Sequence, residues 1–219
     1  MKPLSPASFR WLALPGIAAC LIVVCSSCSK KSGGRINPPN YNSNAGSAAI
    51  DAYDTNRDGV ISGSEFDRVP GLLASLRQVD SNDDKSISAD EIDARIKNWL
   101  ESRIGESPVR CSVTFDGTPL EDAVVLFEPE AFLGSNVHPA SGTTGDAGVA
   151  GMSMVKEHLA DPTFGGVANG WYKIRVTSGT KSIPAIYNTE TTPGCEVAMD
   201  AHWVGASEIV IALKSQSTK

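Results

Sequence analysis

Residues 54–65 and 80–91 repeat one pattern of oxygen-bearing side chains at an offset of 26 residues. In each segment such side chains stand at positions 1, 3, 5, 9 and 12, and position 12 is a glutamate that can chelate with both oxygens. Ca²⁺ is a hard cation that takes about six to eight oxygen ligands, and this spacing converges oxygens on one point. The repeat therefore predicts two calcium loops.

Apolar residues repeat at the same offset as the loops. Isoleucine stands at position 8 of both segments, where two paired loops exchange a short β-bridge. The other matched apolar positions are Ile50 and Leu76, Tyr53 and Val79, and Phe66 and Ile92. An apolar stripe on each flanking helix would let the loops close back to back over a shared core. Residues 47–103 therefore resemble a pair of EF-hands, which implies a small all-α unit.

The resemblance also implies which residues bind calcium. In the first loop the implied ligands are Asp54, Asn56, Asp58, the Val60 carbonyl, Ser62 and Glu65. In the second loop they are Asp80, Asn82, Asp84, the Ser86 carbonyl, Ser88 and Glu91. The serine at position 9 is expected to act through a water molecule.

The second loop departs from the EF-hand pattern at position 6, where Lys85 replaces glycine. This position needs a positive φ, which costs a residue with a Cβ about 1 kcal/mol, and the lysine adds a positive charge beside the cation. We therefore expect weaker calcium binding in the second loop, partly offset by Asp83 and Asp90. The linker between the loops is short, and Pro70 is expected to begin its second helix, so a structural calcium role is favoured over a switch.

Beyond residue 104 the sequence pattern becomes alternating. Val109, Cys111, Val113 and Phe115 alternate with polar residues, which is the period of a half-buried strand. Further strand-like runs cover residues 123–127, 148–155, 171–177, 195–199 and 208–213. Short strands separated by turns favour an antiparallel β-sandwich. The predicted fold class is thus multidomain, with a small all-α EF-hand pair over residues 47–104 and an all-β antiparallel sandwich over residues 108–219.

Several turn and strand motifs of this region stand in a characteristic order, over residues 113–120, 123–129, 144–148, 170–174 and 183–188. In this order they resemble carboxypeptidase-regulatory-like, transthyretin-like modules of exported bacterial lipoproteins. Such modules support or bind, so the resemblance implies no catalytic activity. Residues 129–142 are expected to form a long connection, with a binding loop as the alternative.

The residue chemistry does not indicate an enzyme either. His138, His158 and His202 are scattered in loop-like contexts without the spacing of metal ligands. The chain also has no G-x-S-x-G elbow and no phosphate-binding loop.

The first 28 residues have the features of an export signal. Basic residues precede a mostly apolar run over residues 11–24, which is shorter than the ~20 residues of a membrane-spanning helix. A cysteine after such a run resembles a bacterial lipoprotein cleavage site, where the new N-terminal cysteine is acylated. Cys20 and Cys28 both fit, and Cys28 is preferred because it ends the apolar run and precedes a polar linker over residues 29–46. A plain secretory signal or an uncleaved anchor is the alternative.

Charge and cysteine content limit the partners and the covalent structure. The net charge is −6, and no basic patch with interleaved aromatic residues indicates nucleic acid binding. Outside the leader the cysteines are Cys111 and Cys195. An oxidising compartment permits a disulfide between them, and two buried free thiols are the alternative.

These patterns together predict a calcium-binding, non-catalytic lipoprotein of the cell envelope. The protein would be anchored to the membrane through Cys28 and would act as a binding or scaffolding module for an envelope protein or glycan. The alternative is a calcium-responsive regulatory protein that exposes a partner-binding surface. A third hypothesis is an enzyme with a site in the β-region loops, near His138 or His158.

Overall fold

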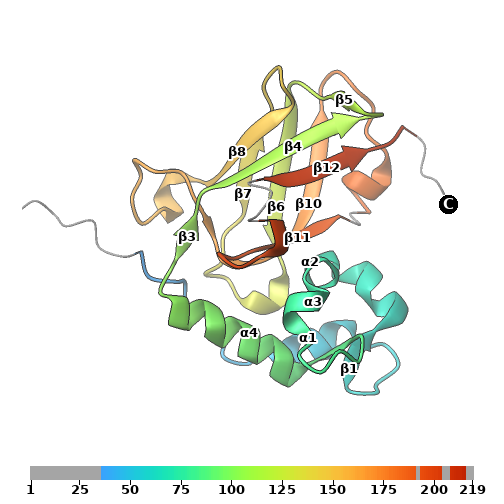
Figure 1. Ribbon diagram of the computed structural model, residues 1–219, viewed down its shortest axis with the longest axis vertical. Coiled ribbons are helices and arrows are strands. Elements are labelled where there is room, and N and C mark those ends of the chain that lie inside the picture. Colours follow the sequence, from blue (N-terminus) through green and yellow to red (C-terminus); the bar gives the residue numbers. More distant parts are fainter. Residues whose placement is uncertain (1–35, 191–192, 204–207, 216–219) are drawn as a thin grey trace, which may run out of the picture. The chain divides into compact units, whose positions relative to one another are not determined.

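The computed structural model describes residues 36–190, 193–203 and 208–215 (Figure 1). The predicted leader, with Cys20 and Cys28, lies outside the described residues, and so does the first part of the predicted linker. The described residues belong to one compact unit, Arg35–Lys219.

Short helices and one two-stranded sheet occupy residues 45–102. Their order is α1 (Ala45–Tyr53), β1 (Val60–Ser62), the 3₁₀ helix η1 (Gly63–Arg68), α2 (Pro70–Ala74), α3 (Leu76–Val79), β2 (Ser86–Ser88) and α4 (Ala89–Ser102). Pro70 begins α2, as the sequence predicts, because a missing N–H costs nothing at the first helical position. Ser88 caps α4: its hydroxyl accepts the Glu91 N–H, and the Glu91 carboxylate accepts the Ser88 N–H.

Most of the remaining strands form one curled sheet. They are β4 (Val109–Phe115), β5 (Thr118–Pro119), β6 (Ala123–Pro129), β7 (Ala140–Thr143), β8 (Val149–Met154), β10 (Gly170–Ser178), β11 (Gly194–Val197) and β12 (Ile209–Leu213). The hydrogen-bonded order is β11-β10-β6-β7-β8-β4-β12, with β5 beside β4. A separate antiparallel pair joins β3 (Glu106–Ser107) to β9 (Val167–Ala168). The connections contain the 3₁₀ helices η2 (Ala131–Leu133), η3 (Lys156–His158) and η4 (Ala185–Tyr187).

Alternating burial explains the strands. In β4, Val109, Cys111 and Val113 are buried, while Arg110 between them is exposed. The strand predicted from this alternation is confirmed with the same bounds. A strand buried on one face has its register fixed, because a slip of one residue would expose the apolar set.

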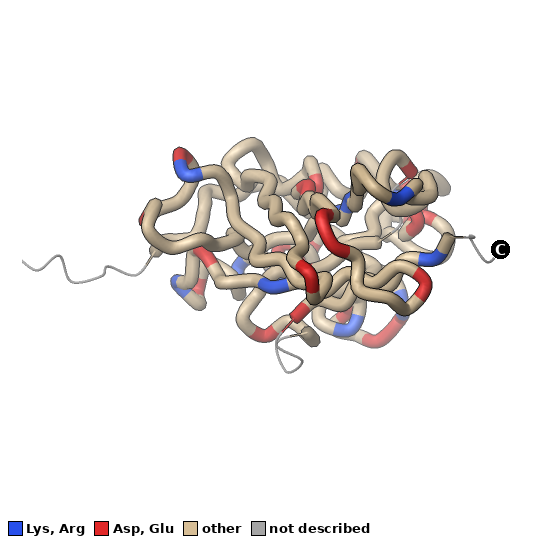
Figure 2. Tube along the Cα trace, turned by 90° about the horizontal axis from the view of Figure 1, so that it is seen from above, with Lys and Arg blue, Asp and Glu red and all other residues tan. Residues whose placement is uncertain are grey.

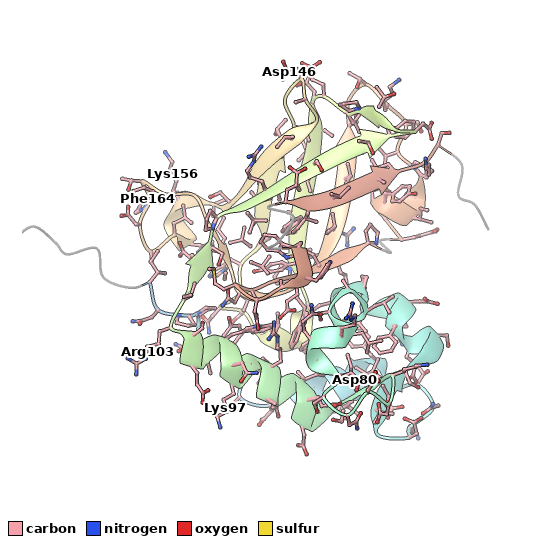
Figure 3. All side chains as sticks on the ribbon, in the orientation of Figure 1. Asp80, Lys97, Arg103, Asp146, Lys156 and Phe164 are labelled. Atoms are coloured by element: carbon pink, nitrogen blue, oxygen red, sulfur yellow. The ribbon has the colours of Figure 1, made fainter. Side chains whose placement is uncertain are left out.

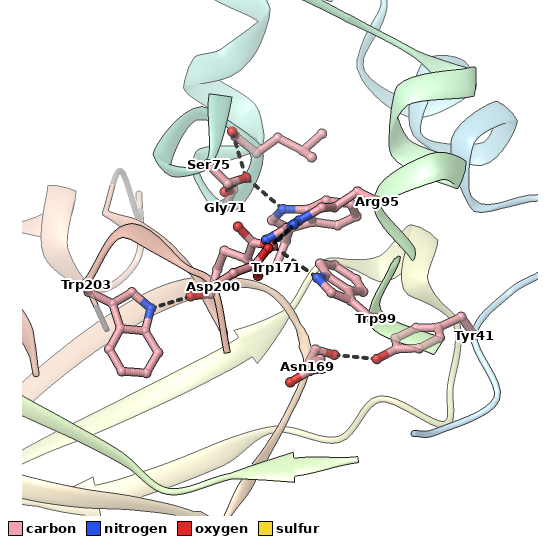
Figure 4. Close-up of polar contacts among 11 residues, drawn as sticks. Tyr41, Gly71, Ser75, Arg95, Trp99, Asn169, Trp171, Asp200 and Trp203 are labelled. Carbon is pink, nitrogen blue, oxygen red and sulfur yellow. Dashed lines mark hydrogen bonds and ion pairs between the residues drawn. The ribbon is translucent and has the colours of Figure 1, made fainter. Parts of the chain in front are cut away.

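Buried aromatic residues join the helices to the sheet. The rings of Trp99 in α4 and Trp171 in β10 have centroids 4.4 Å apart, and both side chains are buried. The Trp171 indole N–H donates to the Ser75 hydroxyl at 2.7 Å (Figure 4). Gly71 in α2 lies so close to β10 that a Cβ there would be 2.9 Å from the Tyr172 nitrogen. The close approach of α2 to the sheet therefore requires glycine at this position.

This packing corrects the predicted fold class. The prediction of a small all-α EF-hand pair followed by an all-β antiparallel sandwich is wrong, because the described chain is mostly β and its short helices pack onto the sheet within one unit. The sheet does not form two facing antiparallel layers either. Strand β7 pairs with both β6 and β8, which continues one sheet around the curl, and β12 pairs in parallel with β4. Helices of 4 to 14 residues bury too little apolar surface to form a core alone.

The two cysteines of the sheet are free thiols. Cys111 and Cys195 are both buried, and no disulfide joins them. The Cys111 sulfur lies 3.6 Å from the Met152 sulfur, and burial raises the pKa of the Cys111 thiol to about 11. Of the two alternatives left open by the sequence, the structure thus has the pair of buried thiols.

Charged residues of both signs are interspersed along the described trace (Figure 2). Over the whole sequence, 25 acidic residues outnumber 19 lysines and arginines. None of the helices in the described part of the chain has the length and apolarity needed to cross a membrane.

Candidate functional site

Strands β1 and β2 hold the two oxygen-rich loops side by side. The strands pair antiparallel with Ile61 opposite Ile87, and both isoleucines are fully buried. Val60 pairs with Ser88, and Ser62 pairs with Ser86. These residues are positions 7 to 9 of their loops, so the short β-bridge expected at position 8 is confirmed.

In the first loop, carboxylates accept hydrogen bonds from the loop's own backbone. The Asp54 carboxylate accepts the Gly59 N–H at 2.8 Å. The Glu65 carboxylate accepts the Thr55 N–H at 2.7 Å with one oxygen and the Ser62 N–H at 2.9 Å with the other. Bonds to a charged acceptor are stronger than neutral ones, so the two end residues hold the loop closed.

The second loop repeats these three hydrogen bonds. Asp80 accepts the Lys85 N–H at 2.8 Å, and Glu91 accepts the Ser81 and Ser88 N–H groups at 2.9 and 3.0 Å. Position 3 also matches, because the asparagine side-chain oxygen accepts the N–H of position 5 at 2.8 Å in the first loop and 3.0 Å in the second. The repeated sequence thus produces a repeated hydrogen-bond frame.

Both loops adopt the left-handed conformation at positions 4 and 6. In the first loop φ is 64° at Arg57 and 89° at Gly59, and in the second it is 60° at Asp83 and 65° at Lys85. The positive φ expected at position 6 is therefore confirmed for both loops. Lys85 adopts it with a Cβ, at a cost of about 1 kcal/mol that Gly59 avoids.

Hydrogen bonds favour the ionised form of the loop carboxylates. The N–H groups of Ser62 and Thr55 lower the pKa of Glu65 to about 2. Burial alone would raise the pKa of Glu91, but the bonds from the two serines at its side outweigh burial, and the pKa is lowered. The Ser86 hydroxyl lowers the pKa of Asp84. Both loops therefore carry negative charge at neutral pH.

The donor atoms of each loop fit a hard cation, because they are all oxygens. As they lie in the structure, however, these donor atoms do not form a complete metal site. No three His, Cys, Asp or Glu side chains within residues 36–190, 193–203 and 208–215 stand close enough together to hold a metal ion. Figure 3 shows Asp80 in the helical region, away from the strands of the large sheet. To bind a cation, the carboxylates of a loop would have to move closer together. They would also have to give up some of the hydrogen bonds that they accept from backbone N–H groups.

No protein-family model matches this chain, and neither does any curated protein or solved structure with which it was compared. The EF-hand resemblance and the transthyretin-like resemblance therefore gain no support from relatives. What the loops bind has to follow from their own donor atoms and their surroundings.

A buried carboxylate fastens the region before the first loop to the sheet. The hydroxyl of Tyr53, the last residue of α1, donates to Glu130 at 3.1 Å, and the Lys173 ammonium lies 3.5 Å from the same oxygen. Glu130 is 1% exposed. Burial raises its pKa to about 7, although Lys173 and Tyr53 act in the opposite direction.

An arginine fastens the helix after the second loop. Arg95 in α4 donates to Glu196 at 2.6 Å, and its two terminal nitrogens donate to the Asp200 carboxylate at 2.8 Å each (Figure 4). The Trp99 indole N–H donates to the same Glu196 oxygen at 3.1 Å. Arg95 and Glu196 are buried, whereas the Asp200 side chain is 67% exposed. These partners are 101 and 105 residues apart, so no sequence spacing could have paired them.

The structure also brings two of the three histidines together. His138 and His158 stack, whereas His202 lines a mostly apolar cavity of about 430 Å³ that is bounded by residues of β11 and β12. The stacked pair had no signal in the sequence, because the two residues belong to different connections of the sheet.

Proposed function

We propose that the two loops bind calcium ions and that the protein is a calcium-binding, non-catalytic lipoprotein of the cell envelope. The observation that carries this proposal is the matched frame of the loops. In both, the oxygen side chains at positions 1, 3 and 12 are oriented by corresponding backbone N–H groups. An oxygen-only set of six or more donors suits Ca²⁺ better than Mg²⁺, which demands a stricter octahedral geometry and keeps several of its waters.

The residues that would hold the ions are those implied by the loop positions. In the first loop they are the carboxylates of Asp54, Asp58 and Glu65, with Asn56, Ser62 and the Val60 carbonyl. In the second loop they are the carboxylates of Asp80, Asp84 and Glu91, with Asn82, Ser88 and the Ser86 carbonyl. When bound, calcium supplies two positive charges to a loop whose ligands carry three negative ones. The contribution of the chain is to place those carboxylates on one short loop and to keep them ionised.

A structural role for calcium is favoured over a switch. The helices α1 and α4, which flank the pair of loops, are fastened to the sheet through Tyr53 and Arg95. Opening a groove between them would break both contacts, including a buried ion pair. An ion that tightens the loops would instead stabilise the joined unit. We therefore propose a binding or scaffolding module for an envelope protein or glycan, with the calcium-responsive regulatory protein as the less favoured alternative.

Isothermal titration calorimetry on the protein without residues 1–29 tests the calcium proposal. We expect two sites with dissociation constants of roughly 10⁻⁴ to 10⁻³ M, as in other extracytoplasmic modules. Glu65→Gln should remove the stronger site and Glu91→Gln the weaker one. Glu101→Gln makes the same charge change at an exposed position of α4 and is the matched control. The absence of heat at millimolar calcium would reject the proposal.

Circular dichroism and an apolar dye distinguish the two roles of calcium. A structural ion should raise the melting temperature relative to EDTA with little change in helix content. A large helical gain, or calcium-dependent dye binding, would instead favour the regulatory alternative.

Metabolic labelling with an alkyne fatty acid in a bacterial host tests the anchor. Cys28→Ala should abolish fatty-acid incorporation and membrane retention, while Cys20→Ala should leave both unchanged. The reverse result would place the acylated cysteine at residue 20, and labelling that survives both substitutions would reject a lipoprotein anchor.

A further inference from the structure

The rings of His138 and His158 form a parallel stack on the surface of the sheet region. Their centroids are 3.5 Å apart and their planes differ by 8°. His138 lies between η2 and β7, and His158 is the last residue of η3. The His138 side chain is partly exposed and that of His158 is exposed. Both imidazoles are thus accessible from solvent.

The sheet topology explains why these two residues meet. Strands β7 and β8 pair antiparallel with Ala140 opposite Met154. The chain that enters β7 and the chain that leaves β8 therefore lie at the same end of this ladder. Val137, directly before the first histidine, is buried, and the His158 N–H donates to the Val155 carbonyl at 3.0 Å. The fold thus holds both backbones while the two rings stay at the surface.

The paired rings have the chemistry of metal ligands. A neutral imidazole binds divalent ions of the zinc, nickel and copper group, and it is a poor ligand for hard cations such as Ca²⁺. Burial, and then the nearby His158, lower the pKa of His138. A neutral imidazole carries a lone pair on its unprotonated nitrogen, which is the atom that binds a metal ion.

We propose that His138 and His158 form a binding site for a divalent transition-metal ion of the zinc, nickel or copper(II) group. Zinc binds histidine nitrogens at about 2.0–2.1 Å, so one ion can join two nitrogens that are about 4 Å apart or less. The ring centroids are 3.5 Å apart, so rotation about the side-chain bonds can bring one nitrogen of each ring within this distance. The nitrogen lone pairs lie in the ring planes, so the two rings must rotate out of the parallel stack to bind one ion. The His158 side chain is exposed and is free to make this rotation. Water completes the coordination.

The site is separate from the calcium loops. Lys156, two residues before the second histidine, lies on a segment at the opposite side of the view from Asp80 (Figure 3). The two proposals therefore fail independently, because one rests on oxygen donors of the helical region and the other on imidazole nitrogens beside the sheet.

Calorimetric titration with NiCl₂ and ZnCl₂ tests the proposal on untagged protein saturated with calcium, so that the acidic loops do not compete. We expect one site per chain. His138→Ala and His158→Ala should each weaken it by more than about tenfold, since loss of even an indirect partner of a metal ligand costs about 10- to 100-fold. His202→Ala removes the third histidine of the chain and should leave the affinity unchanged.

Proton NMR of the imidazole rings gives a second readout on the unmutated protein. Substoichiometric Ni²⁺ is paramagnetic and should broaden the ring signals of His138 and His158 before those of His202. Equal broadening of all three, binding that survives both alanine substitutions, or no binding at millimolar metal would each overturn the proposal. Far-ultraviolet circular dichroism of each variant confirms that a loss of binding is not a loss of fold.

Discussion

The two loops are alike inside and different at the places where they join the sheet. Within the loops, Asp54 and Asp80 accept the N–H of position 6 at the same distance of 2.8 Å. Outside them, the first loop is attached through the Tyr53 hydroxyl and a buried carboxyl, and the second through the Arg95 ion pairs. Hydrogen bonds within a loop follow residue spacing, so a repeated sequence repeats them. Attachments depend on distant partners on the sheet, and these are not repeated.

The largest effect in this comparison is expected at Arg95. Arg95→Met leaves the Glu196 carboxylate buried without its cation, and breaking such a pair costs about 3–5 kcal/mol. Urea unfolding should show this loss, whereas Asp200→Asn should cost under about 1 kcal/mol because its side chain is 67% exposed. Equal losses in both variants would mean that the buried part of the network is not the main attachment of α4.

The attachment of the first loop should respond to pH. The pKa of Glu130 is raised from 4.5 to about 7 by burial, so the folded state holds its proton after the unfolded chain has lost it. The Glu130 carboxyl gives its full contribution to stability below pH 4.5, and this contribution is lost as pH rises through about 7. The stability lost between these two limits is at most about 3 kcal/mol.

Unfolding of wild type and Glu130→Gln between pH 5 and pH 8 measures this contribution. The wild type should lose stability relative to the variant as pH rises. Glu128→Gln removes a partly exposed carboxylate of β6 that pairs with Arg175, two residues before Glu130, and is the control. Parallel pH curves for wild type and Glu130→Gln would show that the Lys173 ammonium keeps Glu130 ionised.

Tyr53→Phe should have a smaller effect on the same attachment. The substitution removes the 3.1 Å hydrogen bond to Glu130 but keeps the ring, which forms a T-shaped pair with the Phe132 ring. Glu130 keeps Lys173 as a polar partner in this variant. Loss of the hydrogen bond from Tyr53 should therefore cost about 1–2 kcal/mol of stability. A destabilisation in this range, smaller at low pH than at pH 8, is expected from thermal unfolding, because a charged acceptor binds the hydroxyl more strongly.

Local features of the fold were predictable from sequence, and long-range ones were not. The alternation at Val109–Phe115, the start of α2 at Pro70 and the positive φ of Lys85 each depend on residues a few positions apart. The fold class failed because Trp99 and Arg95 find their partners on β10 and β11, which makes the helices part of the sheet's core. The His138–His158 stack escaped prediction for the same reason, since it depends on the register of β7 with β8.

The smallest predicted effect on stability is at position 6 of the loops, and it tests most directly why the two loops differ. Position 6 is glycine in the first loop and Lys85 in the second, with φ of 89° and 65°. Lys85→Gly should stabilise the calcium-free protein by up to about 1 kcal/mol, and Gly59→Lys should destabilise it by a similar amount. A Cβ at Gly59 would meet no atom within 4 Å, so backbone strain, and not crowding, is what the second substitution measures.

Calcium titration of the same two variants separates strain from charge. Removal of the lysine should strengthen binding in the second loop, and its introduction should weaken binding in the first. Lys85→Ala keeps a Cβ but removes the charge, so affinity gained by this variant without a gain in stability would assign the weakness of the second loop to the ammonium. If only Lys85→Gly improves the calcium affinity, backbone strain explains the weak binding of the second loop. If neither substitution alters the ratio of the two affinities, position 6 is not what distinguishes the loops, and their different attachments to the sheet become the explanation to test next.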